Sequence, residues 1–127
     1  MRGLTVIIAV VAAATLAACG QEGVDVPGAS DEVQEGAQLF AERCSGCHTL
    51  KAAGTQGTAN RSERAQGPNL DQRKETYEDA LYAIRNGGFS GAIMPQNIVV
   101  GDDAEAVARF LEEYSGSDAD DPSAAGS

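Results

Sequence analysis

Apolar residues recur with the spacing of an α-helix in three parts of the sequence. In the first part, Val33, Ala37 and Phe40 are spaced i, i+4 and i+7, and Ser30 precedes them as the expected N-cap. No part of the sequence alternates apolar and polar residues for long enough to predict a strand. Residues 49–70 are rich in glycine and are expected to form a long loop, which in a compact domain is usually functional. The pattern predicts an all-α fold of three main helices with long loops.

The two later helices carry recognisable end signals. The second is expected to begin at residues 76–79 (TYED), which have the spacing of a capping box, and to end at residues 86–88 (NGG). The third is expected to begin near Asp102 and Glu105, which are three residues apart, and to end at Gly116. Its apolar face is formed by Val107, Phe110, Leu111 and Tyr114.

The chain divides into four segments. Residues 1–18 start with a positive charge at Arg2 and continue as an uncharged run that is short for a membrane span, which is typical of a signal peptide. Residues 19–29 are glycine-rich and acidic, and are expected to form a flexible tether. Residues 30–116 contain all six aromatic residues and are expected to form the single domain. Residues 117–127 contain three Asp and no large apolar side chain, so a disordered acidic tail is expected.

The end of the signal segment carries a candidate modification site. Residues 16–19 (LAAC) resemble the lipobox of bacterial lipoproteins, which implies cleavage before Cys19, which is diacylated and becomes the new N-terminus. The alternative is ordinary signal cleavage with no role for Cys19. We expect lipidation, because an unmodified N-terminal thiol would be open to oxidation and because two acyl chains give a stable anchor. The domain would then be held on the outer face of the cytoplasmic membrane.

The strongest chemical signal is residues 44–48 (CSGCH), whose spacing is that of covalent haem attachment. Thiols three residues apart on one turn can each add to a vinyl group of the same porphyrin, and the following His is held under the iron. A disulfide redox motif would need a βαβ context, and structural zinc would need four Cys or His ligands. We therefore expect one haem c, attached through Cys44 and Cys47, with His48 as an iron ligand.

Met94 is the candidate for the second axial ligand. It is the only Met apart from Met1, it precedes Pro95, and it lies in an irregular segment between the second and third helices. The alternative is a Met that fills a gap in the core. The loop position favours ligation, and His/Met ligation raises the reduction potential and suits electron transfer. If Met94 is displaceable, the protein is instead a haem-based sensor or binding protein for a small ligand.

These separated features together resemble the class I monohaem cytochromes c, in a bacterial lipoprotein form. The resemblance covers most of residues 31–116 and rests on four features: the CSGCH motif after the first helix, residues 67–70 (GPNL), residues 94–95 (MP), and a last helix with Phe110 and Tyr114.

The resemblance assigns roles to further residues. The carbonyl of Pro68 is implied to accept a hydrogen bond from the ring of His48, which would orient the ring and raise its basicity. Leu70 is implied to pack on the haem. Gly36 and Phe40 are implied to cross the last helix, where the glycine permits close approach. The expected activity is one-electron transfer in a respiratory or related extracytoplasmic chain, and not enzymatic catalysis.

Charge limits the range of partners. The chain has 9 Lys and Arg against 19 Asp and Glu, a net charge of −10, which argues against a nucleic-acid binder. Residues 43–74 nevertheless carry a net charge of +4. These bases either decorate a solvated loop, pair with haem propionates, or form a rim that steers the domain to an acidic partner, with Arg61 and Arg64 as the test positions.

The expected partners are redox proteins at the membrane: a quinol–cytochrome oxidoreductase, a terminal oxidase or an exported dehydrogenase. The sequence does not choose among the three. A peroxidase-like enzyme is the weakest alternative, because the chain has a single His and so lacks a second one for acid–base work beside the iron.

Overall fold

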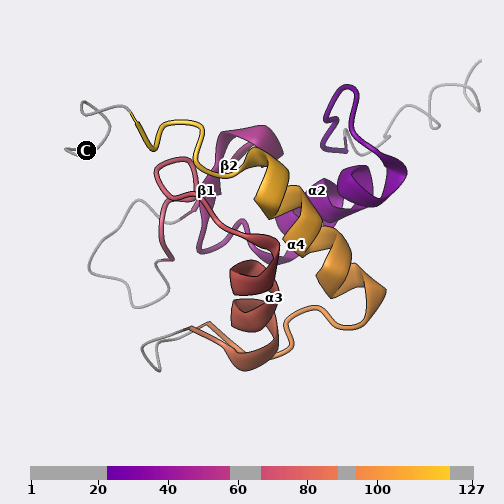
Figure 1. Cartoon of the computed structure of the whole chain (residues 1–127), viewed down its shortest axis with the longest axis vertical. Helices are drawn as coiled ribbons and strands as arrows, with labels where there is room; N and C mark the ends of the chain where they lie inside the picture. The colour runs from indigo at the N-terminus through magenta and orange to yellow at the C-terminus, as the bar shows by residue number, and fades with distance from the viewer. Residues whose placement is uncertain (1–22, 58–66, 89–93, 121–127) are drawn as a thin grey trace, which may run out of the picture.

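The computed structural model describes residues 23–57, 67–88 and 94–120. Its three α-helices are α2 (Asp31–Arg43), α3 (Tyr77–Asn86) and α4 (Asp102–Tyr114). Between α2 and α3 lie β1 (Thr49–Leu50), the short 3₁₀ helix η2 (Lys51–Ala53) and β2 (Thr55–Gln56). The three expected helices are therefore present, as Figure 1 shows. None of the helices in the described part of the chain is long and apolar enough to cross a membrane.

The first helix, α2, begins at its expected cap. The Ser30 hydroxyl accepts a hydrogen bond from the Val33 backbone N–H at 3.3 Å, which satisfies one of the free donors of the first turn. The face predicted from the apolar spacing is the buried face, and Phe40 on it is 1% exposed. The helix ends where the Cys44 N–H donates to the Phe40 carbonyl at 2.8 Å. The haem-attachment motif therefore starts directly at the end of this helix.

The core is built around the crossing of α2 and α4, which Figure 1 shows side by side. Gly36 lies at the crossing, where a Cβ atom would come within 2.6 Å of the Ala106 carbonyl carbon. The rings of Phe40 and Phe110 pack beside it with centroids 5.9 Å apart, and Tyr114 stacks on Phe110 at 5.5 Å. The predicted close approach of the first and last helices is confirmed.

Helix α3 has the predicted ends. The Thr76 hydroxyl accepts from the Asp79 N–H at 3.2 Å, and Gly87 follows the helix with a φ of +80°. The helix packs on α4, where the Arg109 guanidinium lies 4.5 Å from the ring centre of Tyr77. This cation–π contact joins the start of α3 to the middle of α4.

Helix α4 begins at Asp102, as predicted. Gly101 is the N-cap, with a φ of +60° and no side-chain hydrogen bond, and Asp102 is the first helical residue. Asp102, Asp103 and Glu105 therefore stabilise the first turn through their charge at the positive end of the helix dipole. The spacing of Asp102 and Glu105 was a correct signal for a helix start, although neither residue is the cap.

The expected loop over residues 49–70 contains regular structure near its start. Strands β1 and β2 pair in antiparallel register, with Thr49 opposite Gln56 and Leu50 opposite Thr55. A turn through η2 joins them, and Gly54 closes that turn with a φ of +64°. Strands of two residues are too short to show an alternating pattern, which is why the sequence gives no sign of them.

The described parts of the two terminal segments contact the domain. Residues 23–29, expected as part of a flexible tether, lie along α2: the Val24 N–H donates to Gln38 Oε1 at 3.0 Å and the Val26 N–H to Gln34 Oε1 at 2.8 Å. Val26 itself is buried. Residues 117–120, expected as part of a disordered tail, form turns in which the Asp118 N–H donates to the Asp71 carbonyl at 2.7 Å.

Candidate functional site

The CSGCH motif forms one tight turn at the end of α2. The Cys44 carbonyl accepts hydrogen bonds from the N–H groups of Cys47 at 3.1 Å and His48 at 3.0 Å. This turn gathers the two thiols and the imidazole in one place, as the spacing predicts. Both thiols are free; Cys44 is buried and Cys47 is half-buried.

The environment of Cys44 argues against the rival roles of the motif. Burial and, to a smaller extent, the neighbouring Cys47 raise the pKa of the Cys44 thiol to about 12. A thiolate is the reactive species in disulfide exchange and in zinc binding, and this thiol is protonated at neutral pH. In the described residues, moreover, no group of three or more His, Cys, Asp or Glu side chains is placed to hold a metal ion. The burial of Cys44 therefore favours neither of these two rival roles.

His48 is oriented by a backbone carbonyl. Its Nδ1 lies 3.1 Å from the Pro68 carbonyl oxygen, and the Gly67 N–H donates to the Cys47 carbonyl at 2.8 Å alongside. A carbonyl oxygen can only accept, so Nδ1 carries the proton. In the neutral ring, Nε2 then keeps its lone pair and is the nitrogen able to bind iron.

Burial lowers the pKa of His48, and the hydrogen bond to Pro68 offsets part of that effect. The imidazole is therefore neutral near pH 7, which is the form that binds a metal. On one side the Phe40 ring lies 6.3 Å from the His48 ring, centre to centre. The predicted pairing of His48 with Pro68 is present in the structure.

Gly67 makes room for the histidine ring. A Cβ atom at Gly67 would lie 2.6 Å from His48 Nδ1, a separation that real Cβ atoms do not show. The same requirement is absent at Gly46, inside the motif, where a Cβ atom would meet nothing within 4 Å. A glycine before Pro68 is therefore a steric condition for the observed position of the ring.

Leu70 belongs to the core. It is 4% exposed, and its N–H donates to the Thr49 carbonyl at 2.9 Å. A single parallel bridge joins Thr49 to Asn69. These contacts hold residues 68–71 next to β1, directly beside the histidine. The burial of Leu70 agrees with an apolar packing role, and its contact with haem stays a prediction.

Met94 is half-buried and packs against the core. Its backbone approaches the end of α3: a Cβ atom at Gly87 would lie 2.7 Å from the Met94 carbonyl oxygen. The Asn97 N–H donates to the Ile84 carbonyl at 2.8 Å just beyond. Met94 therefore lies next to the end of α3, while residues 89–93 lie outside the described part.

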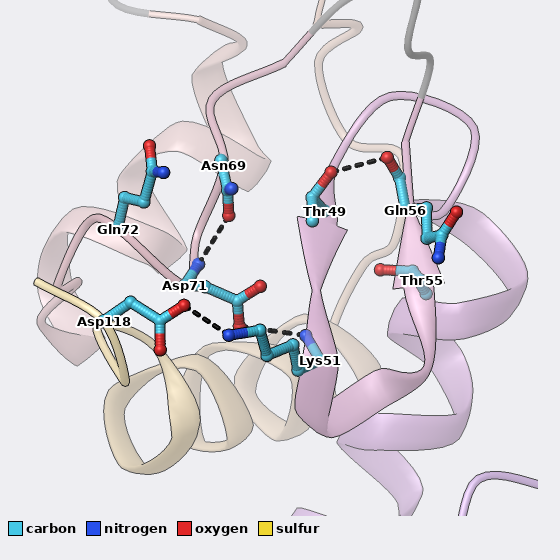
Figure 2. Close-up of a pocket in the computed structure, with 8 residues that line it drawn as sticks. All are labelled: Thr49, Lys51, Thr55, Gln56, Asn69, Asp71, Gln72 and Asp118. Carbon is cyan, nitrogen blue, oxygen red and sulfur yellow. Dashed lines mark hydrogen bonds and ion pairs between the residues drawn. The ribbon is translucent and has the colours of Figure 1, made fainter. Parts of the chain in front are cut away.

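A cavity of about 500 Å³ lined by polar side chains lies next to β1, which directly follows His48, and Figure 2 shows the side chains that line it. Sequence reasoning missed it, because its residues come from three separate segments. They are Thr49, Lys51, Thr55, Gln56, Asn69, Asp71, Gln72 and Asp118.

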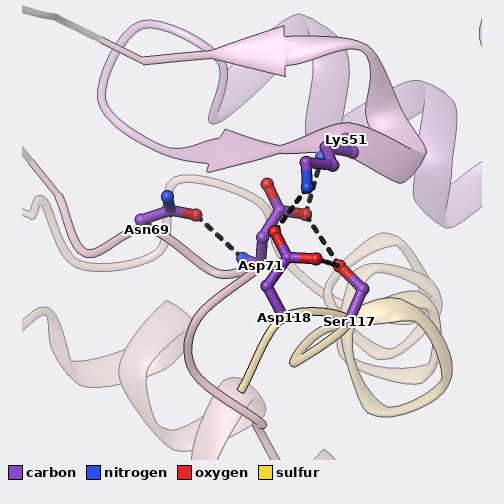
Figure 3. Close-up of polar contacts among 5 residues, drawn as sticks. All are labelled: Lys51, Asn69, Asp71, Ser117 and Asp118. Atoms are coloured by element: carbon purple, nitrogen blue, oxygen red, sulfur yellow. Dashed lines mark hydrogen bonds and ion pairs between the residues drawn. The ribbon is translucent and has the colours of Figure 1, made fainter. Parts of the chain in front are cut away.

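Asp71 is the buried member of this group and is 2% exposed. Its Oδ1 accepts from the Lys51 backbone N–H at 2.9 Å and from the Ser117 hydroxyl at 3.3 Å. Its own N–H donates to Asn69 Oδ1 at 2.9 Å, and the Lys51 ammonium pairs with the Asp118 carboxylate (Figure 3). The one sequence signal for Asp71 is an acidic residue directly after the GPNL segment.

Three of the sequence-based candidates lie outside the described residues. They are the lipidation candidate Cys19 and the two steering candidates Arg61 and Arg64. The structure brings together the attachment thiols, the histidine and the Pro68 carbonyl at one end of α2.

Comparison with known proteins places these features in one family. Residues 33–115 match the family described as Cytochrome c. Among solved structures, the chain is similar to the c-type cytochrome SorU from Sinorhizobium meliloti, with 34% sequence identity and a TM-score of 0.55; the match covers 68% of this chain and 93% of that one. The chain has no match among curated proteins. The expected fold of three helices, long loops and a covalent haem is confirmed.

Proposed function

Because the chain belongs to the cytochrome c family, we propose that it carries single electrons on an iron held between His48 and Met94. Membership means that the chain binds haem c covalently, and Cys44 and Cys47 are the thiols of its attachment motif. When bound, haem c supplies a one-electron Fe(III)/Fe(II) couple. Electron transfer is the general activity of the family; the ligands, the membrane anchor and the pathway are the proposal.

One observation carries the choice of His48 as a ligand: the hydrogen bond from its Nδ1 to the Pro68 carbonyl. This bond fixes the tautomer and the plane of the ring and leaves Nε2 as the donor nitrogen. Burial keeps the ring neutral, so the ligating form is already present before the iron binds. The chain thus orients its only His for coordination.

The choice of Met94 rests on its backbone position and its burial. Its backbone lies close to Gly87 at the end of α3, and its side chain packs against the same core as the aromatic rings of α2 and α4. A thioether in an apolar setting is a weak but sufficient axial ligand and favours the reduced iron, which raises the reduction potential.

The remaining residues of the site support transfer by being rigid. Both attachment thiols are fixed by the backbone turn at Cys44, and the loop that holds Pro68 is bonded to β1. Groups held in this way change position little between the two oxidation states. The chain therefore contributes orientation, exclusion of water and a fixed ligand geometry, and we propose no acid–base or group-transfer role for it.

We further propose that the protein is a lipoprotein on the outer face of the cytoplasmic membrane, diacylated at Cys19. The support is the sequence alone: an apolar signal segment followed by the LAAC match. An anchored domain would exchange electrons with membrane proteins such as a quinol–cytochrome oxidoreductase or a terminal oxidase, or with an exported dehydrogenase. Anchoring raises the effective concentration of the domain beside them.

The test is an absorption spectrum of the haem-loaded protein, oxidised and reduced, with and without carbon monoxide. We expect a weak red-region sulfur-to-iron band in the oxidised protein and no response to carbon monoxide. Met94→Ala should lose the band and bind carbon monoxide. The matched control is Ile98→Ala, which removes a neighbouring half-buried side chain and should keep the band.

The opposite outcome separates the alternatives. If the unmodified protein lacks the band and binds carbon monoxide readily, Met94 is displaceable. The haem-based sensor or binding protein then replaces the electron carrier as the better description.

A further inference from the structure

We propose that Asp71 is a positioning residue for the iron-binding histidine. Its buried carboxylate fixes residues 68–70 against β1 and so determines where the Pro68 carbonyl meets the ring of His48. The inference rests on the proposed role of His48 as a ligand, but its test is independent of Met94.

The first support is a row of contacts between two chain segments that run side by side. His48 contacts Pro68 through Nδ1 at 3.1 Å, the Leu70 N–H donates to the Thr49 carbonyl at 2.9 Å, and the Asp71 carboxylate accepts from the Lys51 N–H at 2.9 Å. The contacts follow one another in the same order on both segments. Asp71 therefore closes one end of a row whose other end is the histidine.

The second support is the place where the row ends. Strand β1 stops at Leu50, and the chain then turns into η2 at Lys51. Lys51 lies just beyond the paired part of β1, whose register with β2 covers Thr49 and Leu50. The Asp71 carboxylate supplies an acceptor at this point.

The third support is that the segment after α4 contacts Asp71 and holds it in place. The Ser117 hydroxyl donates to its Oδ1 at 3.3 Å (Figure 3). The Asp118 N–H donates to its carbonyl at 2.7 Å. The Gly116 N–H adds a 2.8 Å bond to the Leu70 carbonyl. The segment after α4 is thus hydrogen-bonded to residues 70–71. Asp71 is 2% exposed, so its carboxylate has little freedom to move.

Two substitutions of Asp71 distinguish a positioning effect of the carboxylate from an effect of its charge. Asp71→Ala removes the carboxylate that accepts from the Lys51 N–H in a partly buried setting, which loosens the loop at that end. Asp71→Asn removes the charge but keeps an oxygen in the Oδ1 position. If the carboxylate acts by positioning, the Asn variant should resemble the parent protein and the Ala variant should not.

The experiment follows the His48 ring in the haem-loaded protein by NMR. We measure the exchange rate of the Nδ1 proton and the hyperfine shifts of the ring. In Asp71→Ala we expect exchange faster by about tenfold or more, because the bond to Pro68 opens more often, together with altered ring shifts. In Asp71→Asn we expect rates and shifts near those of the parent.

The control is Ser115→Ala. Ser115 is buried, and its hydroxyl accepts from the Glu75 N–H at 2.9 Å, so its loss destabilises the same C-terminal segment without touching residues 48–51. It should lower the free energy of unfolding while leaving the ring shifts in place.

Three results would overturn the proposal. They are unchanged exchange in Asp71→Ala, exchange in Asp71→Asn as fast as in Asp71→Ala, and exchange in Ser115→Ala that rises as much at an equal loss of stability. A parent His48 ring without hyperfine shifts would instead reject ligation by His48, and the exchange comparison would still decide the role of Asp71.

Discussion

Gly67 shows how a single missing side chain positions a ligand. The His48 ring occupies the space that a Cβ atom would take, and it reaches the Pro68 carbonyl from there. In Gly67→Ala the ring must turn away and lose that bond. We expect the haem-loaded protein to lose about 1–3 kcal/mol of unfolding free energy, measured by denaturant titration, and to show a higher reduction potential, because an imidazole without that hydrogen bond is less basic and stabilises Fe(III) less.

The matched control for this prediction lies within the attachment motif. Gly46 has open space at its Cβ position, so Gly46→Ala should leave both the stability and the potential close to those of the parent. Equal effects of the two substitutions would mean that the loss reflects glycine replacement in general and not the contact with the ring.

Glu75 gives a prediction on pH. Its carboxylate pairs with Arg73 Nε at 2.6 Å, but burial raises its pKa above the ordinary 4.5, with Asp79 adding to the rise and Arg73 opposing it. The folded state therefore holds this proton more tightly than the unfolded state. The stabilisation is complete below the unfolded pKa and is lost as pH rises through the folded pKa.

The comparison that isolates Glu75 is with Glu75→Gln, which cannot ionise. Between about pH 4 and about pH 7 the parent protein should lose more unfolding free energy than the variant, because only the parent must ionise a buried carboxyl. Parallel stability curves for the two proteins over this range would contradict the raised pKa.

At the scale of elements, the α2–α4 crossing leaves no room for an added side-chain atom. A Cβ atom at Gly36 would overlap the backbone carbonyl of Ala106, and backbone cannot swing aside as a flexible side chain can. Alanine is a better helix former than glycine by about 1 kcal/mol. A loss of stability on replacing Gly36 with alanine would therefore come from the contact with α4 and not from helix propensity.

We expect Gly36→Ala to lower the unfolding free energy by about 1–3 kcal/mol despite that gain, as measured by thermal or denaturant unfolding. Glu35→Ala, on the exposed face of the same helix, should change it by less than about 0.5 kcal/mol. A Gly36→Ala protein as stable as the parent would show that the two helices can separate without cost.

The elements that the sequence predicted are those specified by local chemistry. Ser30 and Thr76 cap their helices through their own hydroxyls, and Gly87 ends α3 with a positive φ that glycine accepts most readily. The N-cap of α4 could not be predicted, because Gly101 caps by conformation and has no side chain to mark it. Strands of two residues were missed because pairing, not periodicity, defines them.

In the candidate site, too, the residues set by local spacing could be predicted and those set by long-range contacts could not. The thiols and the histidine could be predicted from spacing, since they lie on one turn. Pro68 came only from the family resemblance, because its distance of 20 residues from His48 gives no local signal. Asp71 was missed entirely: its role depends on a backbone N–H of Lys51 and a hydroxyl of Ser117, and no sequence pattern shows such long-range bonds.

At the scale of the whole molecule, internal contacts use much of the positive charge of residues 43–74. Lys51 pairs with Asp118, Arg73 pairs with Glu75, and the Lys74 ammonium donates to the Glu112 carbonyl. These three bases therefore serve contacts within the domain. A steering role would depend chiefly on the remaining bases of the segment, Arg61 and Arg64 among them.

Replacing both Arg61 and Arg64 with Gln should lower the association rate with an acidic redox partner several-fold at low salt, because the field that orients the encounter is weakened. At about 0.5 M salt the difference should disappear. Stopped-flow kinetics over a range of salt concentrations measure both effects. Arg85→Gln, which removes an exposed base on α3, is the control; an unchanged salt slope in the double variant would contradict steering.

The docking of residues 23–29 on α2 limits how far the domain can move away from the membrane. If Cys19 carries the lipid, the chain from Cys19 to the docked Val24 spans at most about 18 Å, whereas an undocked chain to Ser30 would span about 40 Å. The hydrogen bonds that the Val24 and Val26 N–H groups donate to the Gln38 and Gln34 side chains thus shorten the free tether by more than half. A partner of the anchored domain would then have to offer its electron-transfer site no farther from the lipid surface than this shorter tether plus the width of the domain.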